Sequence, residues 1–292
     1  MKAAPAAGRA VVPRWVLPFV TINTFVVAVA WASKWLGDRG TPAALWLAAA
    51  ARDSAVVLAL TLATRGKRRI DGRQPPGRAA ALKAWAKLLC VAAPADVAIY
   101  LATVRWGLVQ REPTDSQSLF EPRGGAAWAA AQYVHFVALS FSFEVIFDLL
   151  HYASHRACHS VPRLRSAHAT HHRHSSGLGP ISTYEQSASD VAICNVAPAL
   201  GALWAVAQLR GALSDRDFAL LWAYKAYVEC AGHCGVESRA TSFPQCVWLP
   251  RWLGIALRTA DHDRHHHHGR PCNFAKRFTL WDRCFGTYVP SA

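Results

Sequence analysis

The chain is organised around residues 148–172, which read DLLHYASHRACHSVPRLRSAHATHH. His155 and His159 are four residues apart, so on a helix they share one face. His168, His171 and His172 form a second group with the same kind of spacing. Imidazole is a ligand that first-row transition metals accept readily. The stretch therefore predicts a metal centre built from histidine side chains.

A third histidine group lies near the end of the sequence and consists of His262, His265 and His266. The three groups together hold more imidazoles than one tetrahedral or octahedral ion can use, so we expect two metal ions. His151 stands one helical turn before His155, and we expect it to support the ligands rather than to join them. The pair of histidines expected to bind metal is therefore His155 with His159, and not His151 with His155.

Four apolar runs precede or enter this region, at residues 15–35, 43–63, 85–104 and 126–150. Each approaches the length of about 20 residues that a bilayer span requires. All 14 histidines come after residue 134, so the apolar half and the histidine half are distinct. The expected fold is all-α: a multi-pass membrane helical bundle, with about four spans as two hairpins and a histidine-rich helical cap. We place the N-terminal membrane region at residues 1–126 and the catalytic domain, including the fourth span, at 127–292.

Charged residues interrupt the apolar runs, with Arg52 and Asp53 in the second and Asp96 in the third. A charge at mid-membrane is costly, so these side chains should face other helices or pair with one another. Two further apolar segments, 191–209 and 217–230, fit either a shallow membrane hairpin or buried helices. The sequence leaves that choice open.

The positions of the basic residues predict how the chain is oriented in the membrane. They gather before the first run, as in Lys2, Arg9 and Arg14, and again between residues 65 and 78. The positive-inside rule places both segments in the cytosol, and the histidines after the fourth span then emerge on the cytosolic side. The first nine residues, MKAAPAAGR, are too polar and too interrupted by proline for a clear signal peptide, so the first run is expected to be a retained anchor.

The net charge of +14 suggests an acidic partner. Basic residues beside apolar runs favour an anionic membrane surface. The sequence has neither zinc-finger spacing nor a base-reading basic helix, so we expect no nucleic acid partner. The membrane would be that of the endoplasmic reticulum in a eukaryote and the inner membrane in a bacterium.

Spacing and flanking residues together resemble the fatty acid hydroxylase/sterol desaturase superfamily. The residues that carry the resemblance are Asp148, then His155-Arg156-x-x-His159, His168-x-x-His171-His172, Glu229-x-x-x-His233-x-Gly235, His262-Asp263-x-His265-His266, and an ending that runs from Asn273-Phe274 through Trp281-Asp282 to Gly286-Thr287. This resemblance covers roughly residues 144–288. It extends to the N-terminal spans only in general character.

The resemblance implies an integral-membrane non-haem di-iron enzyme that uses O2 and two electrons. Its implied metal ligands are His155, His159, His168, His171, His172, His233, His262, His265 and His266. His233 enters the set through the resemblance. Four nearby carboxylates are candidates for orienting the imidazoles, and each is equally well explained as a helix cap or an ion-pair partner: Asp148, Glu229, Asp263 and Asp282.

The expected reaction is hydroxylation of a lipid drawn from the bilayer, a sterol or a fatty-acyl lipid, with desaturation and demethylation as variants on the same metal core. Iron reaches the oxidation states that such chemistry needs, whereas zinc has no redox chemistry. Electrons would come from a carrier such as cytochrome b5 or a ferredoxin with its reductase. The alternative is a non-catalytic membrane protein that stores or senses zinc with the same histidines.

Overall fold

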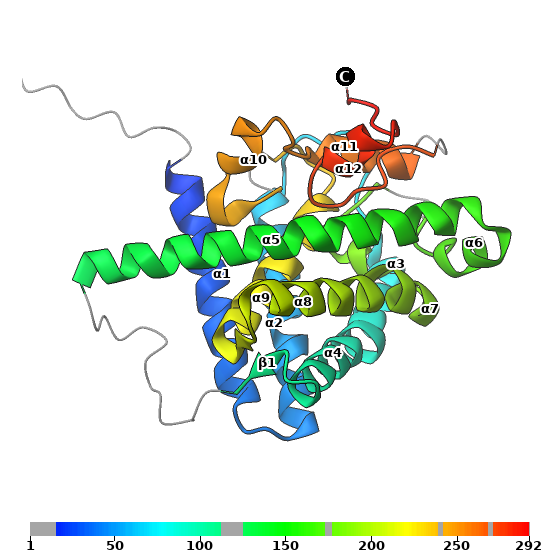
Figure 1. The fold of residues 1–292 in the computed structure, drawn as a ribbon. Coiled ribbons are helices and arrows are strands. Elements are labelled where there is room, and N and C mark those ends of the chain that lie inside the picture. The colour runs from blue at the N-terminus through cyan, green and yellow to red at the C-terminus, as the bar shows by residue number, and fades with distance from the viewer. Residues whose placement is uncertain (1–15, 112–124, 173–176, 239–241, 268–270, 292) are drawn as a thin grey trace, which may run out of the picture.

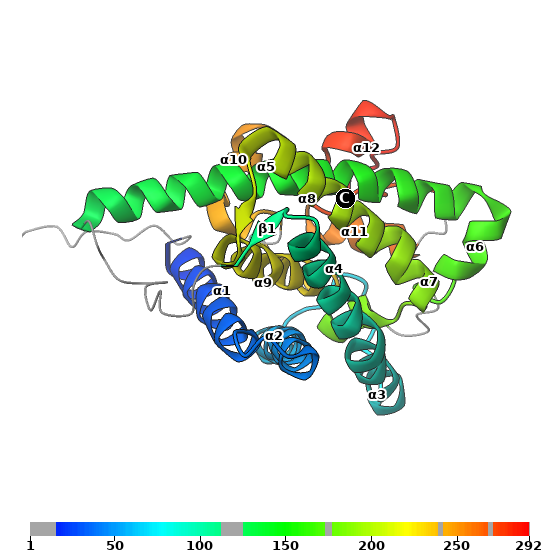
Figure 2. The same ribbon diagram turned by 60° about the horizontal axis from the view of Figure 1, so that its bottom comes forward.

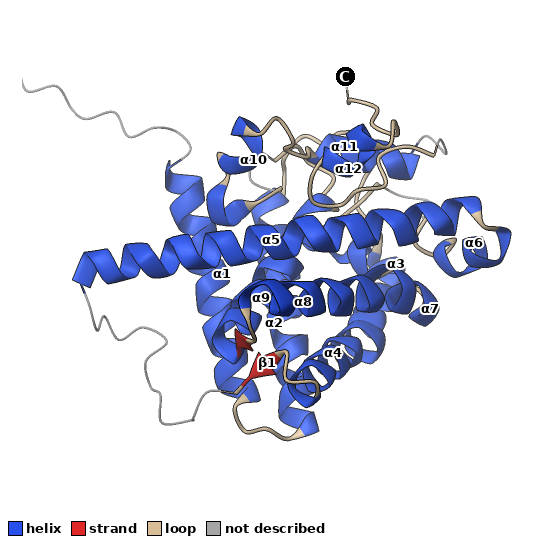
Figure 3. Cartoon of the chain, viewed as in Figure 1, coloured by secondary structure: helices blue, strands red, loops and turns tan. Residues whose placement is uncertain are grey.

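The computed structural model describes residues 16–111, 125–172, 177–238, 242–267 and 271–291. Nearly all of its regular structure is helical (Figure 3). The α-helices are α1 Val16–Gly37, α2 Pro42–Thr64, α3 Arg78–Lys87, α4 Ala93–Arg105, α5 Gly125–Ser160, α6 Pro162–His168, α7 Ala188–Val191, α8 Ala197–Arg210, α9 Asp215–Gly232, α10 Leu249–Trp252, α11 Thr259–His267 and α12 Leu280–Cys284. Short π- and 3-10 segments are η1 Leu88–Ala92, η2 Pro180–Tyr184, η3 Ala192–Val196 and η4 Pro244–Cys246. Two-residue strands β1 Val109–Gln110 and β2 Leu213–Ser214 pair in parallel.

Helix α5 crosses the whole molecule (Figure 1). It has 36 residues, and at 1.5 Å of rise per residue it is about 54 Å long. Its N-terminal part is the fourth apolar run, and the same helix continues without a break to His155 and His159. The predicted ligand histidines of α5, His155 and His159, are therefore rigidly joined to a membrane span.

Among the described residues, five helical stretches are long and apolar enough to cross a membrane: Val16–Gly37, Pro42–Thr64, Arg78–Arg105, Gly125–Ser160 and Ala188–Arg210. The first four contain the apolar runs that the sequence predicts. The fifth, made of α7, η3 and α8, covers the segment 191–209 that the sequence left undecided. Residue 15, the first of the predicted run 15–35, lies outside the described residues.

The outer surface of the bundle carries large apolar side chains. On α1, Leu17 is 72% exposed and Trp35 is 58% exposed, and Leu62 of α2 and Leu209 of α8 are exposed by 70% and 73%. An apolar surface of this kind belongs against lipid rather than water. Together with the five apolar helices, it confirms the prediction of an all-α membrane bundle.

The charges inside the second and third runs do pair with one another. Arg52 is buried on α2, where its Nε lies 2.8 Å from Asp53 Oδ1. Its Nη2 forms an ion pair with Asp96 of α4. These contacts agree with the expectation that mid-span charges are paired within the bundle.

Helix α9 lies in the middle of the bundle, against α1 and α2 (Figure 2). Its N-terminus is capped by Ser214, whose hydroxyl accepts a hydrogen bond from the Asp217 backbone N–H. The side chains along it, including Trp222 and Tyr227, are buried. Since α9 ends at Gly232, the next residue, His233, lies at the histidine-rich end of the molecule.

Arg277 joins the C-terminal segment to α5 and α9. Its side chain is fully buried, with Nε 2.7 Å from Glu144 and Nη2 3.0 Å from Glu229. The guanidinium also lies 5.0 Å from the centre of the Phe147 ring. Burial alone would raise the pKa of Glu229, but Lys225, Lys276 and Arg277 together hold this pKa below its usual range.

Replacing Arg277 with Met should strongly destabilise the protein, because two buried carboxylates lose a partner. The loss of one member of a buried ion network costs about 3–5 kcal/mol, which corresponds to a fall in melting temperature of about 10 °C. Thermal unfolding in detergent would measure this. The control is Arg258→Met, which removes the exposed pair with Glu237. Equal shifts in the two variants would contradict the prediction.

Candidate metal centre

The fold brings all nine predicted ligand histidines to one place. They come from four parts of the chain: the end of α5, α6 with the turn after it, the residue that ends α9, and α11. Most of them are buried, although His159, His172 and His266 are partly exposed. Helix α11 lies beside the C-terminal half of α5 (Figure 1), so the end of the sequence completes a site that residues 155–172 begin.

Five of the imidazoles form a first set, defined as His155, His159, His168, His172 and His265. One nitrogen from each ring lies within 4.8 Å of the others. The Nε2 atom of His172 is 2.9 Å from that of His168 and 3.2 Å from that of His265. Nitrogens from separate helices therefore converge on one point, as metal ligands do.

Hydrogen bonds on the outer side of this set orient the rings. The Nδ1 atoms of His155 and His265 lie 2.8 Å and 2.7 Å from the carbonyl oxygens of Phe274 and Cys272. A ring that donates from Nδ1 presents the lone pair of Nε2 to the centre. Within the described part of the chain, the buried Nε2 atoms of His155 and His159 have no hydrogen-bond partner, which is the state expected of atoms that bind metal.

The second set consists of His171, His233, His262 and His266. His262 Nε2 is 3.1 Å from His233 Nε2 and 3.2 Å from His266 Nε2. His171 joins them through ligand atoms within 4.8 Å of those of His233 and His266. His233 is oriented by its own helix, because its Nδ1 lies 2.8 Å from the Glu229 carbonyl oxygen.

The two sets touch each other. The ring of His266 lies 4.8 Å, centroid to centroid, from that of His172 in the first set and at the same distance from that of His171 in its own. The nine imidazoles thus divide into five and four around two adjacent points.

The donor set also fits a transition metal electrostatically. Burial, together with the neighbouring imidazoles, lowers the pKa of His265 to about 3. Burial likewise lowers the pKa of His262 and of His266. Metal binding requires neutral imidazoles, so these side chains already have the protonation state of ligands at neutral pH.

Two of the expected supporting acids act on backbone rather than on histidine. Asp148 accepts hydrogen bonds from the N–H groups of residues 276, 277 and 278, at 2.7, 2.9 and 3.1 Å. Asp282 accepts from Phe274 and Ala275 at 2.9 and 2.8 Å. Both carboxylates therefore hold residues 274–278, which carry the Phe274 carbonyl that orients His155.

The other expected supporting residues differ in how they contribute. Glu229 reaches His233 through its backbone carbonyl, while its carboxylate pairs with cations. His151 lies beside the first set, with its ring 5.1 Å from that of His155 and its Nδ1 2.7 Å from the Cys194 carbonyl oxygen. Asp263 is buried within α11.

A further carboxylate, Asp190, contacts a predicted ligand, although the sequence did not indicate this role. Asp190 Oδ1 lies 2.8 Å from His168 Nδ1, and Asp190 is fully buried. Ser187-x-x-Asp190 has the form of a capping box, and Ser187 does accept a hydrogen bond from the Asp190 N–H. That pattern predicts a helix start, so nothing in it indicated a role beside a metal ligand.

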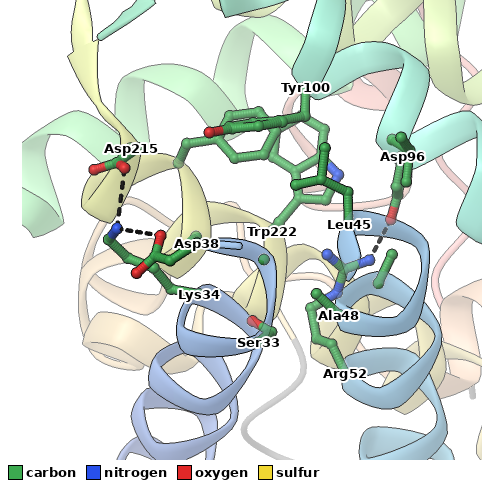
Figure 4. A pocket seen from close by; sticks show the side chains of 15 residues that line it. Ser33, Lys34, Asp38, Leu45, Ala48, Arg52, Asp96, Tyr100, Asp215 and Trp222 are labelled. Atoms are coloured by element: carbon green, nitrogen blue, oxygen red, sulfur yellow. Dashed lines mark hydrogen bonds and ion pairs between the residues drawn. The ribbon is translucent and has the colours of Figure 1, made fainter. Parts of the chain in front are cut away.

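A cavity of about 10 Å³ beside the second set is lined by His233, His262 and Glu229. A second cavity, of about 30 Å³, also reaches Glu229 and extends to Asp96 and Trp222. A third, of about 80 Å³, shares Asp96 and Trp222 with the second. Figure 4 shows its walls, where Lys34 bonds to Asp38 and Asp215 while Arg52 bonds to Asp96.

Comparison with known proteins places this arrangement in a family. The family model described as fatty acid hydroxylase matches residues 140–287. The chain is 32% identical over 150 residues to the fatty acid hydroxylase vlmA of Lecanicillium sp., a match covering 50% of this chain and 40% of that protein. It is 29% identical over 153 residues to the methylsterol monooxygenase erg25B of Aspergillus fumigatus, covering 51% of this chain and 48% of that protein. The matches thus span less than half of each relative, and no solved structure matches the chain significantly.

Replacing Asp190 with Asn should weaken metal binding, because a neutral amide makes the His168 ring less basic than a carboxylate does. Loss of such an orienting contact typically costs about 10–100-fold in metal affinity. Competition with a chromogenic chelator would measure the change. Asp217→Asn is a control, since Asp217 is a buried aspartate that bonds to Ser214 at the far end of α9. An unchanged affinity in the Asp190 variant would show that the contact is only structural.

Proposed function

The chain belongs to the fatty acid hydroxylase family, and from this premise we propose that it is an integral-membrane non-haem di-iron oxygenase that hydroxylates a lipid with O2 and two electrons. The observation that carries the proposal is the division of nine converging imidazoles into adjacent sets of five and four. A pair of adjacent ions accounts for that division. A single ion leaves several of these imidazoles without a role.

Iron is the metal we propose for both sites. Bound non-haem iron would supply the redox chemistry that activates O2 for attack on an unactivated C–H bond, which zinc does not. The first set would hold one ion and the second set the other. Asp190 and the carbonyls of Phe274, Cys272 and Glu229 keep the ligand rings aimed inward.

The proposed substrate is a sterol or a fatty-acyl lipid. One relative is named for fatty acid hydroxylation and the other for methylsterol monooxygenation. Desaturation and demethylation remain alternatives within the same chemistry, since they differ in where the substrate hydrogen is held. We propose that the lipid enters from the bilayer between the spans.

The proposed orientation has the metal centre on the cytosolic side of the membrane, which is the endoplasmic reticulum membrane in a eukaryote or the inner membrane in a bacterium. The basic segments before the first span and at residues 65–78 support this orientation. We propose cytochrome b5, or a ferredoxin with its reductase, as the electron donor, because a basic surface suits an acidic carrier.

Purified protein should contain about two irons per chain and consume O2 when lipid extract and an electron donor are supplied. Iron quantitation by mass spectrometry together with an oxygen electrode would measure both. The alternative function is non-catalytic storage or sensing of zinc. Protein that holds only zinc, and that shows no lipid-dependent O2 uptake after reconstitution with iron, would favour that alternative and sink the proposal.

His171→Ala should abolish O2 uptake and lower the metal content, because the second set, to which His171 belongs, would then keep only three imidazoles. Membrane insertion should stay intact, as judged by fractionation and size-exclusion chromatography. His135→Ala is the matched control: this imidazole is 53% exposed and lies 3.9 Å from Asp217, outside both sets. Full activity in the His171 variant would overturn the ligand assignment.

A further inference from the structure

The second cavity is polar, although it lies among apolar helices. It is formed between α2, α4, η2, η3 and α9, and its lining includes Asp53, Tyr184, Gln186, Asn195, Lys225 and Glu229. A cavity that held only hydrocarbon would not need such walls. The polar groups that line it therefore indicate what kind of molecule the cavity binds.

Asn195 has an acceptor that the protein does not satisfy. The residue is 7% exposed, and its Nδ2 donates to Gln186 Oε1 at 3.1 Å. Its Oδ1 is buried and has no hydrogen-bond partner among the residues that the structure describes. A buried amide oxygen without a donor is costly. A ligand that donates a hydrogen bond would remove this cost.

A local distortion of the fifth apolar helix displays Asn195 to the cavity. Asn195 lies in the π-helical segment η3, and π-turns within helices often occur at functional sites. Pro198 follows shortly and has no N–H to offer the Cys194 carbonyl. That carbonyl instead lies 2.7 Å from His151 Nδ1. The same turn thus contacts the metal centre and presents Asn195 to the cavity.

The charges around the cavity disfavour an anion. Lys225 is already paired with Glu229 at 3.0 Å, and Arg52 is paired with both Asp53 and Asp96. The lining itself has three carboxylates, Asp53, Asp96 and Glu229, against one lysine. A carboxylate or phosphate group would have to enter beside these acids without a cation of its own.

We propose that this cavity binds the polar end of an uncharged lipid, whose hydroxyl or amide N–H donates a hydrogen bond to Asn195 Oδ1. Where that lipid is the substrate, the inference rests on the proposed function. It narrows the substrate class to neutral lipids with a hydrogen-bond donor, and it makes Asn195 a specificity-determining residue. A free fatty acid in its carboxylate form is excluded from this site.

The placement of the cavity sets which end of the lipid faces the metal centre. Asn195 directly follows Cys194, whose carbonyl contacts His151, and Glu229 lines both this cavity and the one beside His233. The polar end is therefore held on the side of the histidines. The third cavity shares Asp96 and Trp222 with the second and has Leu45 and Tyr100 in its walls (Figure 4).

Photoreactive lipids test this directly in the full-length, metal-loaded protein in phosphatidylcholine nanodiscs. The probes are hexadecanol, its methyl ether and hexadecanoate, each with a diazirine at the same chain position. Crosslinks would be located by peptide mass spectrometry. The alcohol should label residues around the second cavity at least tenfold more than the ether or the carboxylate. Equal labelling by alcohol and ether would overturn the proposal, and so would stronger labelling by the carboxylate.

Two variants of equal shape isolate the acceptor. Asn195→Thr keeps an oxygen, whereas Asn195→Val has the same shape without one. Hexadecanol labelling should fall at least tenfold in Asn195→Val and about threefold or less in Asn195→Thr. Gln132→Val is the control, because Gln132 lines a different cavity and bonds to Arg216. Equal labelling of the Thr and Val variants, with both still monodisperse and metal-loaded, would overturn the role of Asn195.

The labelling readout keeps this inference separate from the proposed function. If O2 uptake is absent but hexadecanol still labels the cavity in an Asn195-dependent way, the oxygenase proposal fails and the binding site stands. If lipid-dependent O2 uptake is present but labelling does not depend on Asn195, the oxygenase proposal stands and the binding site fails.

Discussion

Asp148 anchors the C-terminal segment to α5 through three successive backbone N–H groups. The segment it holds supplies the Phe274 carbonyl that orients His155, and Cys272, which orients His265, lies just before it. The first histidine set depends on this anchor, because a ligand ring whose Nδ1 loses its partner is free to turn. A buried carboxylate surrounded by N–H donors is thus what couples the end of the chain to the membrane helix.

The need to neutralise buried charge shapes the rest of the bundle. Arg277 joins Glu144 of α5 to Glu229 of α9, and Arg52 joins the acids of α2 and α4. In a low-dielectric interior an unpaired charge is very costly, so each pair fixes which helices are neighbours. The same pairing leaves few charges to meet a ligand. This is why an uncharged lipid suits the second cavity.

Both the helices and individual hydrogen bonds position the imidazoles of the candidate metal centre. Helix α5 supplies two candidate ligands on one face, α6 and the turn after it supply three, the residue after α9 supplies one, and α11 supplies three. Their outer nitrogens are held by carbonyls and by Asp190, so the inner nitrogens point to two adjacent positions. Such an arrangement is suited to holding two ions at the end of a membrane bundle.

The sequence by itself determined the helical class, four of the five apolar stretches and eight of the nine candidate ligands, because apolar run length and the spacing of histidines on a helix are local properties. The ninth, His233, came from the family resemblance. Tertiary structure alone decided which imidazoles share a set, since His265 joins His155 while His266 joins His171. It also revealed the contact of Asp190 with His168, where the sequence pattern indicates only a helix cap. It showed that the carboxylates of Asp148 and Asp282 accept hydrogen bonds from backbone N–H groups. The Asp148 contacts join residues 128 to 130 positions apart, and the Asp190–His168 contact joins residues 22 positions apart. Such contacts depend on how the helices pack, which no local pattern encodes.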